Sequence, residues 1–156
     1  MSKAYSFEKP FEVLIANRGQ GLRKEPNPKE NLVFYTDGSL KDAKAGFGVY
    51  GPGMMIAKPL GQWATVFQAE IKAITACVEG LLGRRTRNTR IHILSDSQAA
   101  LRALDAQVHE SWVVWECRDA LMQLAMRNEV VLQWVPGHEM EMKKLMIWPR
   151  KAQRCA

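Results

Sequence analysis

The sequence predicts one α/β domain in which helices pack on a mixed β-sheet. Short apolar runs rich in β-branched residues alternate with longer segments whose apolar residues recur at helical spacing. The first run is followed by a hairpin and the later runs by helices. Three antiparallel strands should therefore precede two strands that pair in parallel. With 156 residues the chain is long enough for one domain with a substantial core.

The N-terminal residues 1–30 are expected to be an extension or linker, because they are mixed in charge and contain three prolines. They would connect the domain to an upstream part of a longer protein. The compact domain is expected over residues 31–139, and residues 140–156 form a divergent basic tail. Charged residues make up 24% of the chain and no apolar run approaches the ~18 residues of a membrane span, so we expect no membrane insertion.

The first strand of the compact domain is expected at Leu32–Thr36, a run that stops at the turn residues Asp37-Gly38-Ser39. The next segment, "AGFGVYGPGMMIAKPLG", predicts a β-hairpin whose two strands join near Gly51-Pro52-Gly53. These two segments supply the three antiparallel strands.

A helix should begin at Thr65, because Thr65-Val66-Phe67-Gln68 matches a capping box, and Gly83 can end it. A fourth strand follows at Ile91–Leu94, and Ser97 can cap the short helix "QAALRALDA".

The last two elements are a helix over residues 111–127 and a fifth strand, "EVVLQWV". The helix is expected to bury Trp112, Trp115, Cys117, Leu121 and Leu124. The tryptophans at 63, 112, 115 and 134 are interpreted as packing residues.

The three cysteines, Cys77, Cys117 and Cys155, form no CxxC pair. This pattern favours reduced thiols in an intracellular protein, nuclear or cytoplasmic and not secreted.

Two aspartates follow apolar strands directly. Asp37 comes after the first strand and Asp96 after the fourth, each with small polar residues behind it. If these strands are neighbours, both carboxylates lie at the same end of the sheet, where open α/β folds place their sites. The alternative is that each aspartate only begins a turn.

Glu70 decides between these alternatives. It shares a helical stripe with Ile74, Cys77, Val78 and Leu81, so it should be buried against the sheet. Burial of a carboxylate costs several kcal/mol unless something compensates it, and the helix dipole returns only ~0.5 kcal/mol. A bound cation is the natural partner, because three neighbouring carboxylates without one would repel and raise each other's pKa values.

An all-oxygen ligand set suits Mg²⁺ or Mn²⁺ better than zinc. Such ions join carboxylates to substrate phosphates, and the net charge of +6 is compatible with a phosphate-bearing partner. The arginines of "GRRTRNTR" (Arg84, Arg85, Arg87 and Arg90) suit phosphate contacts, the alternative being a solvated loop. The chemistry predicted from these residues is metal-assisted phosphodiester hydrolysis.

Four motifs, "YTDGS", "VFQAEIKAI", "ILSDSQAAL" and "WVPGHE", occur in an order and spacing that resemble the type 1 ribonuclease H domain. The resemblance is strongest to the versions carried by non-LTR retrotransposons, and it covers residues 31–139. It implies a five-stranded sheet in the order 3-2-1-4-5 and endonucleolytic cleavage of the RNA strand of RNA–DNA hybrids. It also implies a monomer that belongs to a longer reverse-transcriptase polyprotein.

The resemblance further assigns roles by position. Two Mg²⁺ ions, or Mn²⁺ in their place, are implied. Asp37 would bridge the two ions, and Glu70 and Asp96 would hold one of them. His138 would move protons and help release product. Gly38, Ser39 and Gln68 would lie beside the substrate backbone.

The C-terminal motif departs from the family. Ten residues after His138, where the family has a fourth metal-binding aspartate on a final helix, this sequence has Trp148. Glu139 and Glu141 are acidic, but they stand in the loop and not on that helix. Three hypotheses stay open: an active hybrid ribonuclease weakened by this loss, a non-catalytic nucleic-acid-binding remnant, and another metal-dependent nuclease or integrase of the same fold.

Overall fold

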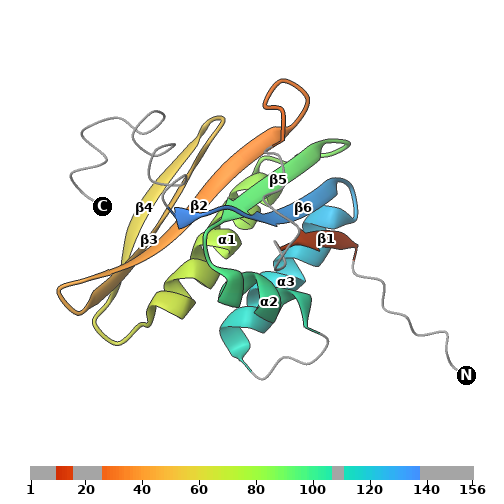
Figure 1. Cartoon of the computed structure of the whole chain (residues 1–156). Helices are drawn as coiled ribbons and strands as arrows, with labels where there is room; N and C mark the ends of the chain where they lie inside the picture. Colours follow the sequence, from red (N-terminus) through yellow and green to blue (C-terminus); the bar gives the residue numbers. More distant parts are fainter. Residues whose placement is uncertain (1–9, 16–25, 107–110, 138–156) are drawn as a thin grey trace, which may run out of the picture.

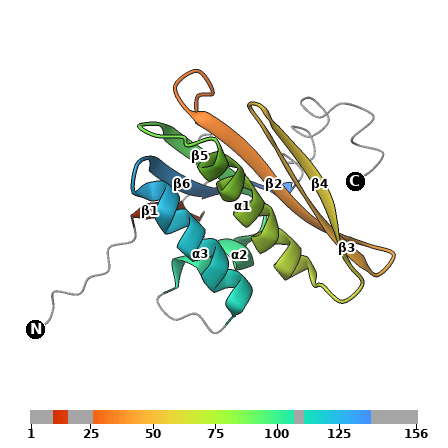
Figure 2. The same ribbon diagram turned by 180° about the vertical axis from the view of Figure 1, so that it is seen from behind.

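The computed structural model describes residues 10–15, 26–106 and 111–137. Within them the chain forms one mixed β-sheet with helices along one side of it (Figures 1 and 2). The strands are β1 (Phe11–Leu14), β2 (Leu32–Lys41), β3 (Lys44–Gly51), β4 (Met54–Gly61), β5 (Arg90–Ser95) and β6 (Glu129–Trp134). The helices are α1 (Val66–Gly83), α2 (Gln98–Asp105) and α3 (Trp112–Ala125).

The sheet order is β1-β6-β5-β2-β3-β4. β2 pairs with β5, β5 with β6 and β6 with β1 in parallel, whereas β2, β3 and β4 form antiparallel pairs. The expected α/β class and the relative order of five strands, written 3-2-1-4-5, are confirmed, because that order corresponds to β4-β3-β2-β5-β6.

The expected number of five strands is wrong, since the described residues form six. The additional strand is β1, which lies in the segment expected to be a linker. It pairs with β6 from Phe11↔Val130 to Leu14↔Gln133, and Phe11 is buried in the core. A sheet edge leaves backbone N–H and C=O groups unpaired, and β1 satisfies those along β6. The division into residues 1–30, 31–139 and 140–156 stays a prediction.

The helix starts follow the sequence signals. The hydroxyl of Thr65 accepts the Gln68 N–H at 3.0 Å, and the side-chain oxygen of Gln68 accepts the Thr65 N–H at 2.9 Å, which completes the capping box of α1. Ser97 caps α2 by accepting the Ala100 N–H at 3.1 Å. None of the helices in the described ranges has the length and apolar character needed to span a membrane.

The expected burial of α3 is correct on one face and wrong on the other. Cys117, Leu121 and Leu124 are buried and share a face with Val114. Trp112 and Trp115 lie off this face, 70% and 47% exposed, and stack on each other with ring centroids 5.0 Å apart. Trp63 is 89% exposed, so its interpretation as a packing residue is also wrong. The phase of α3 turns Trp112 and Trp115 outward, whereas Trp63 lies in the turn between β4 and α1.

Apolar side chains are buried on both faces of the sheet. Phe34 of β2 belongs to the main core with residues of the helices, which include the free thiols Cys77 and Cys117. Its neighbours Val33 and Tyr35 belong to a second cluster with Tyr50, Leu94 and Val135. This alternation is the two-residue period of a strand whose faces are both covered.

Candidate metal centre

Asp37 and Asp96 lie side by side because of the pairing between β2 and β5. The parallel register matches Thr36 with Ser95, and Asp37 and Asp96 directly follow these two residues in the chain. The buried hydroxyl of Thr36 donates to the Leu94 carbonyl at 2.9 Å, which ties the two strands together at this level. The expectation that the two carboxylates meet beside neighbouring strands is confirmed. The expected end of the first strand at a turn is wrong, because β2 continues to Lys41 and Asp37 pairs with Gly48 of β3.

Glu70 comes to the same place because α1 crosses β2 at very close range. A Cβ added to Gly38 would lie 2.6 Å from the Glu70 nitrogen and 2.9 Å from the Ala69 carbonyl carbon. Only glycine permits this approach of helix to strand. The backbone N–H of Gly38 also donates to the Glu70 carboxylate. Gly38 thus sets the distance between the helix-borne acid and Asp37.

The three carboxyl groups form one cluster. One ligand oxygen from each of Asp37, Glu70 and Asp96 lies within 4.8 Å of the others, and Glu70 is only 4% exposed. Its Oε2 is buried and accepts no hydrogen bond from the described residues.

The electrostatics of the cluster are dominated by burial of Glu70 beside two other carboxyl groups. Burial raises the pKa of Glu70 to about 9, and the negative charges of Asp96 and Asp37 add to this rise; the Gly38 N–H opposes it. A divalent cation would reverse the balance, because it offers opposite charge to all three groups and a ligand position for the orphaned Oε2. The residues present therefore fit a hard divalent ion.

Asp96 is held from the β6 side. The indole N–H of Trp134 donates to the Asp96 carbonyl at 3.1 Å, and the Val135 N–H donates to the Ser95 carbonyl at 2.9 Å. A Cβ added to Gly137 would lie 3.2 Å from Asp96 Oδ2, so the chain that leaves β6 runs directly against this carboxylate. Trp134, expected only to be a packing residue, thus also positions Asp96, and its place in "WVPGHE" was the available signal for this role.

Of the remaining expected site residues, the structure describes some and not others. Ser39 is exposed on β2, two residues beyond Asp37. Gln68 is exposed in the first turn of α1, and its oxygen is engaged in the capping box, which leaves its amide N–H groups for a substrate. His138 and the acidic residues Glu139 and Glu141 lie outside the described residues, as does Trp148. The catalytic and substrate-binding roles of all these residues stay predictions.

Comparisons with known proteins agree with this arrangement. The family model described as RNase H matches residues 29–144, which is more than half of the chain. Among solved structures the chain is similar to RNase H1 from the halophilic archaeon Halobacterium salinarum NRC-1, with 21% identity and a TM-score of 0.55. The match covers 71% of this chain and 89% of that one, and at this identity it shows the fold alone. A search of curated proteins finds no match.

Proposed function

Because this chain belongs to the RNase H family, we propose that it cleaves the RNA strand of RNA–DNA hybrids endonucleolytically with the help of divalent ions. The observation that carries the proposal is the convergence of Asp37, Glu70 and Asp96, whose ligand oxygens lie within 4.8 Å of one another. Carboxylates gathered this tightly on three separate elements serve no evident packing purpose, since their mutual repulsion destabilises the fold.

The ion-binding residues would be Asp37, Glu70 and Asp96, and the ions Mg²⁺ or Mn²⁺, two in number by the family resemblance. Bound divalent ions polarise a phosphodiester and activate water for attack on it. The chain's own contribution is to keep three oxygens preorganised. Gly38 fixes Glu70 against β2, and Trp134 fixes the backbone of Asp96.

Substrate would lie across the end of the sheet that bears the carboxylates. Ser39 is exposed on β2, which bears Asp37, and Gln68 is exposed on α1, which bears Glu70. These positions support contacts with the substrate backbone. His138 follows Gly137, the residue against Asp96, and is proposed to move protons and assist product release. Sensing 2′-hydroxyls on one strand would distinguish a hybrid from a DNA duplex.

The second candidate is a non-catalytic protein that binds nucleic acid through the same surface. The sequence has Trp148 where the family has its fourth metal-binding aspartate, and removal of one anionic ligand weakens metal affinity. Descent from a retrotransposon polyprotein, a monomeric state and an intracellular location, nuclear or cytoplasmic, belong to both candidates as proposals.

A cleavage assay on end-labelled RNA–DNA hybrid with Mg²⁺ and with Mn²⁺ separates the candidates. The unsubstituted protein should cut the RNA strand internally, and Asp37→Asn should lower the rate by about 10³-fold. Asp42→Asn is the matched control, because Asp42 is exposed in the β2–β3 turn at φ 52, a conformation that asparagine tolerates. Hybrid binding without cutting would favour the remnant, and cutting that survives Asp37→Asn would eliminate the proposed site.

A further inference from the structure

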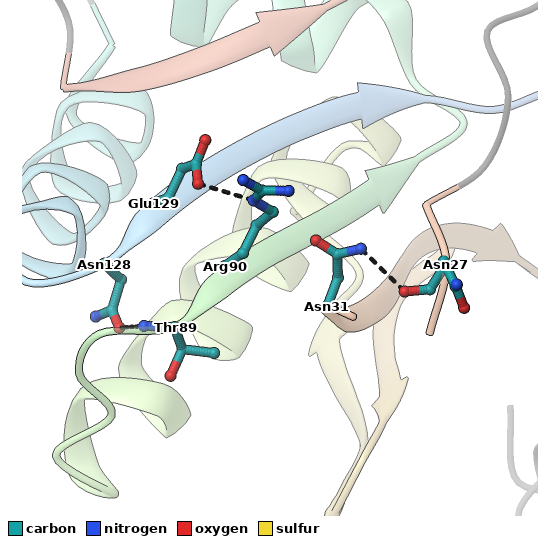
Figure 3. Close-up of polar contacts among 6 residues, drawn as sticks. All are labelled: Asn27, Asn31, Thr89, Arg90, Asn128 and Glu129. Atoms are coloured by element: carbon teal, nitrogen blue, oxygen red, sulfur yellow. Dashed lines mark hydrogen bonds and ion pairs between the residues drawn. The ribbon is translucent and has the colours of Figure 1, made fainter. Parts of the chain in front are cut away.

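The arginine-rich segment "GRRTRNTR" divides into two groups in the structure. Arg84 donates through its guanidinium to the carbonyls of Pro52 and Gly53, at 3.0 Å for Pro52. Arg90 reaches across to Glu129 on β6 at 2.8 Å, as Figure 3 shows. These two cations have partners within the protein.

The other two arginines line a pocket. Arg85 and Arg87 meet Arg127, which follows α3, around a cavity of about 500 Å³ with Leu82, Leu124 and Met126 in its walls. No aspartate or glutamate lines it, and none of the three arginines has an ion-pair partner among the residues that the structure describes. Three like charges brought together from two segments favour an anion between them.

The walls of this pocket are fixed before any ligand arrives. Asn128 donates from its side-chain amide to the carbonyls of Thr86 and Leu124, both at 2.9 Å. Its side-chain oxygen accepts the Thr89 N–H at 3.1 Å, the bond drawn between these two residues in Figure 3. The Asn88 N–H donates to the Arg127 carbonyl at 2.7 Å, which binds the two segments directly.

The backbone of the loop is also held in an uncommon conformation. Arg85 and Asn88 have φ values of 57° and 56°. The left-handed region costs an arginine about 1 kcal/mol, a cost that the surrounding hydrogen bonds must offset.

The pocket lies at the opposite end of the strands from the carboxylates. Its lining residue Asn128 accepts a hydrogen bond from Thr89, the residue before β5, whereas Asp96 follows the end of β5. The five steps from Arg90 to Ser95, at ~3.3 Å each, separate the two ends of β5 by about 17 Å. A nucleic-acid segment seated at the carboxylates would therefore not fill the pocket with the same nucleotides.

We propose that Arg85, Arg87 and Arg127 form a second binding site for the phosphates of a nucleic-acid strand, separate from the carboxylate centre. Planar guanidinium groups bind phosphate oxygens in pairs, and the apolar walls offer a surface for a sugar or base. The choice of nucleic acid as ligand rests on the proposed function; the anion site itself rests on the pocket.

The test compares Arg87→Gln/Arg127→Gln with Lys29→Gln/Lys58→Gln, a control that removes the same charge from two exposed lysines outside the pocket. Binding of a fluorescent RNA–DNA hybrid is measured by anisotropy in EDTA, where no divalent ion supports cleavage, between about 50 and 200 mM salt. The arginine pair should lower the slope of log affinity against log salt by about 2 and weaken binding about tenfold, and the lysine pair should change both less.

Equal slopes and affinities in the unsubstituted protein and the arginine pair would overturn the proposal, provided that both proteins show the same unfolding temperature. An equal loss in both double variants would overturn it too, since it would indicate a general charge effect. Phosphorus NMR with inorganic phosphate provides a further arm: line broadening that needs the arginines, with hybrid affinity unchanged, would assign the pocket to small anions and contradict a strand. Failure of the unsubstituted protein to cleave hybrid would remove the proposed function but leave this salt slope as an independent result.

Discussion

The two ends of the parallel strands carry opposite charges, and the charged groups are buried at one end but exposed to solvent at the other. At the carboxyl end, Asp37, Glu70 and Asp96 crowd within 4.8 Å, and Glu70 is buried with one oxygen that no described residue satisfies. At the amino end the arginines are exposed; Arg84 and Arg90 have protein partners and the rest surround an open pocket.

Solvent makes the difference between these ends. Water screens the exposed arginines, so their repulsion costs little and a ligand adds binding without being needed for folding. Burial removes that screening from Glu70, which must either hold a proton or meet a cation. The carboxylate end therefore needs a proton or a cation to be stable in the folded protein, whereas the arginine end is stable without a ligand.

The largest expected effect comes from disturbing the close contact between Gly38 and α1, which brings Glu70 to Asp37. Gly38→Ala would place a methyl group 2.6 Å from a backbone nitrogen of α1, so strand and helix must separate. We expect a loss of about 1–3 kcal/mol in unfolding free energy and about 100-fold in cleavage rate, because Glu70 would move away from Asp37. Urea unfolding and the hybrid cleavage assay measure both.

Gly83→Ala is the control for this substitution, since a Cβ at Gly83 meets nothing within 4 Å. It should leave the rate unchanged and stability within about 1 kcal/mol of the starting value. A Gly38→Ala protein that cuts hybrid at the original rate would show that the close approach does not govern the site.

The next effect concerns the proton on Glu70. Its pKa is 4.5 as a reference and about 9 in the folded, metal-free protein. Between these two pH values Glu70 is protonated in the folded state but ionised in the unfolded chain. Its contribution to the free energy of unfolding is therefore fully present below pH ~4.5 and is lost as pH rises towards ~9. The unfolding temperature in EDTA should therefore fall with rising pH over this window.

Glu70→Gln should flatten that dependence and raise the unfolding temperature by about 5 °C near pH 9, as followed by circular dichroism. Glu79→Gln, on the exposed side of the same helix, should keep the original slope. Identical slopes in the Glu70→Gln and unsubstituted proteins would mean that Glu70 is not the group responsible.

The smallest expected effects are those of substitutions at the arginine end, which test what holds the walls of the pocket. Asn128→Ala removes three hydrogen bonds to Thr86, Leu124 and Thr89 and should cost about 2 kcal/mol in chemical denaturation. Arg90→Gln breaks an exposed ion pair and should leave the unfolding temperature unchanged. If Arg90→Gln proved the more damaging of the two, the pocket walls would depend on surface charge and not on Asn128.

Local signals in the sequence were sufficient for the elements that surround the site. The capping box at Thr65 and the cap at Ser97 fix two helix starts through contacts within a few residues. Asp37 and Asp96 each follow an apolar run, and an acid lies on the apolar stripe of the intervening helix; these signals were enough to predict that the three carboxyl groups converge.

Features that depend on distant packing were not accessible in the same way. β1 has four residues, and its partner on β6 lies more than a hundred residues further along, so nothing local distinguishes it from a linker. The outward position of Trp112 and Trp115 depends on the phase of α3 against the core, which composition does not give. The contact between Gly38 and α1 likewise exists only once helix and strand are packed.

The most direct test of the metal centre is a calorimetric titration with Mn²⁺ at pH ~7, repeated in buffers of different ionisation heat. We expect the ion to displace a proton from Glu70, so that the measured heat depends on the buffer. Glu70→Gln should bind Mn²⁺ at least about tenfold more weakly and release no proton. Equal affinity in both proteins, with no dependence on buffer in either, would contradict this expectation.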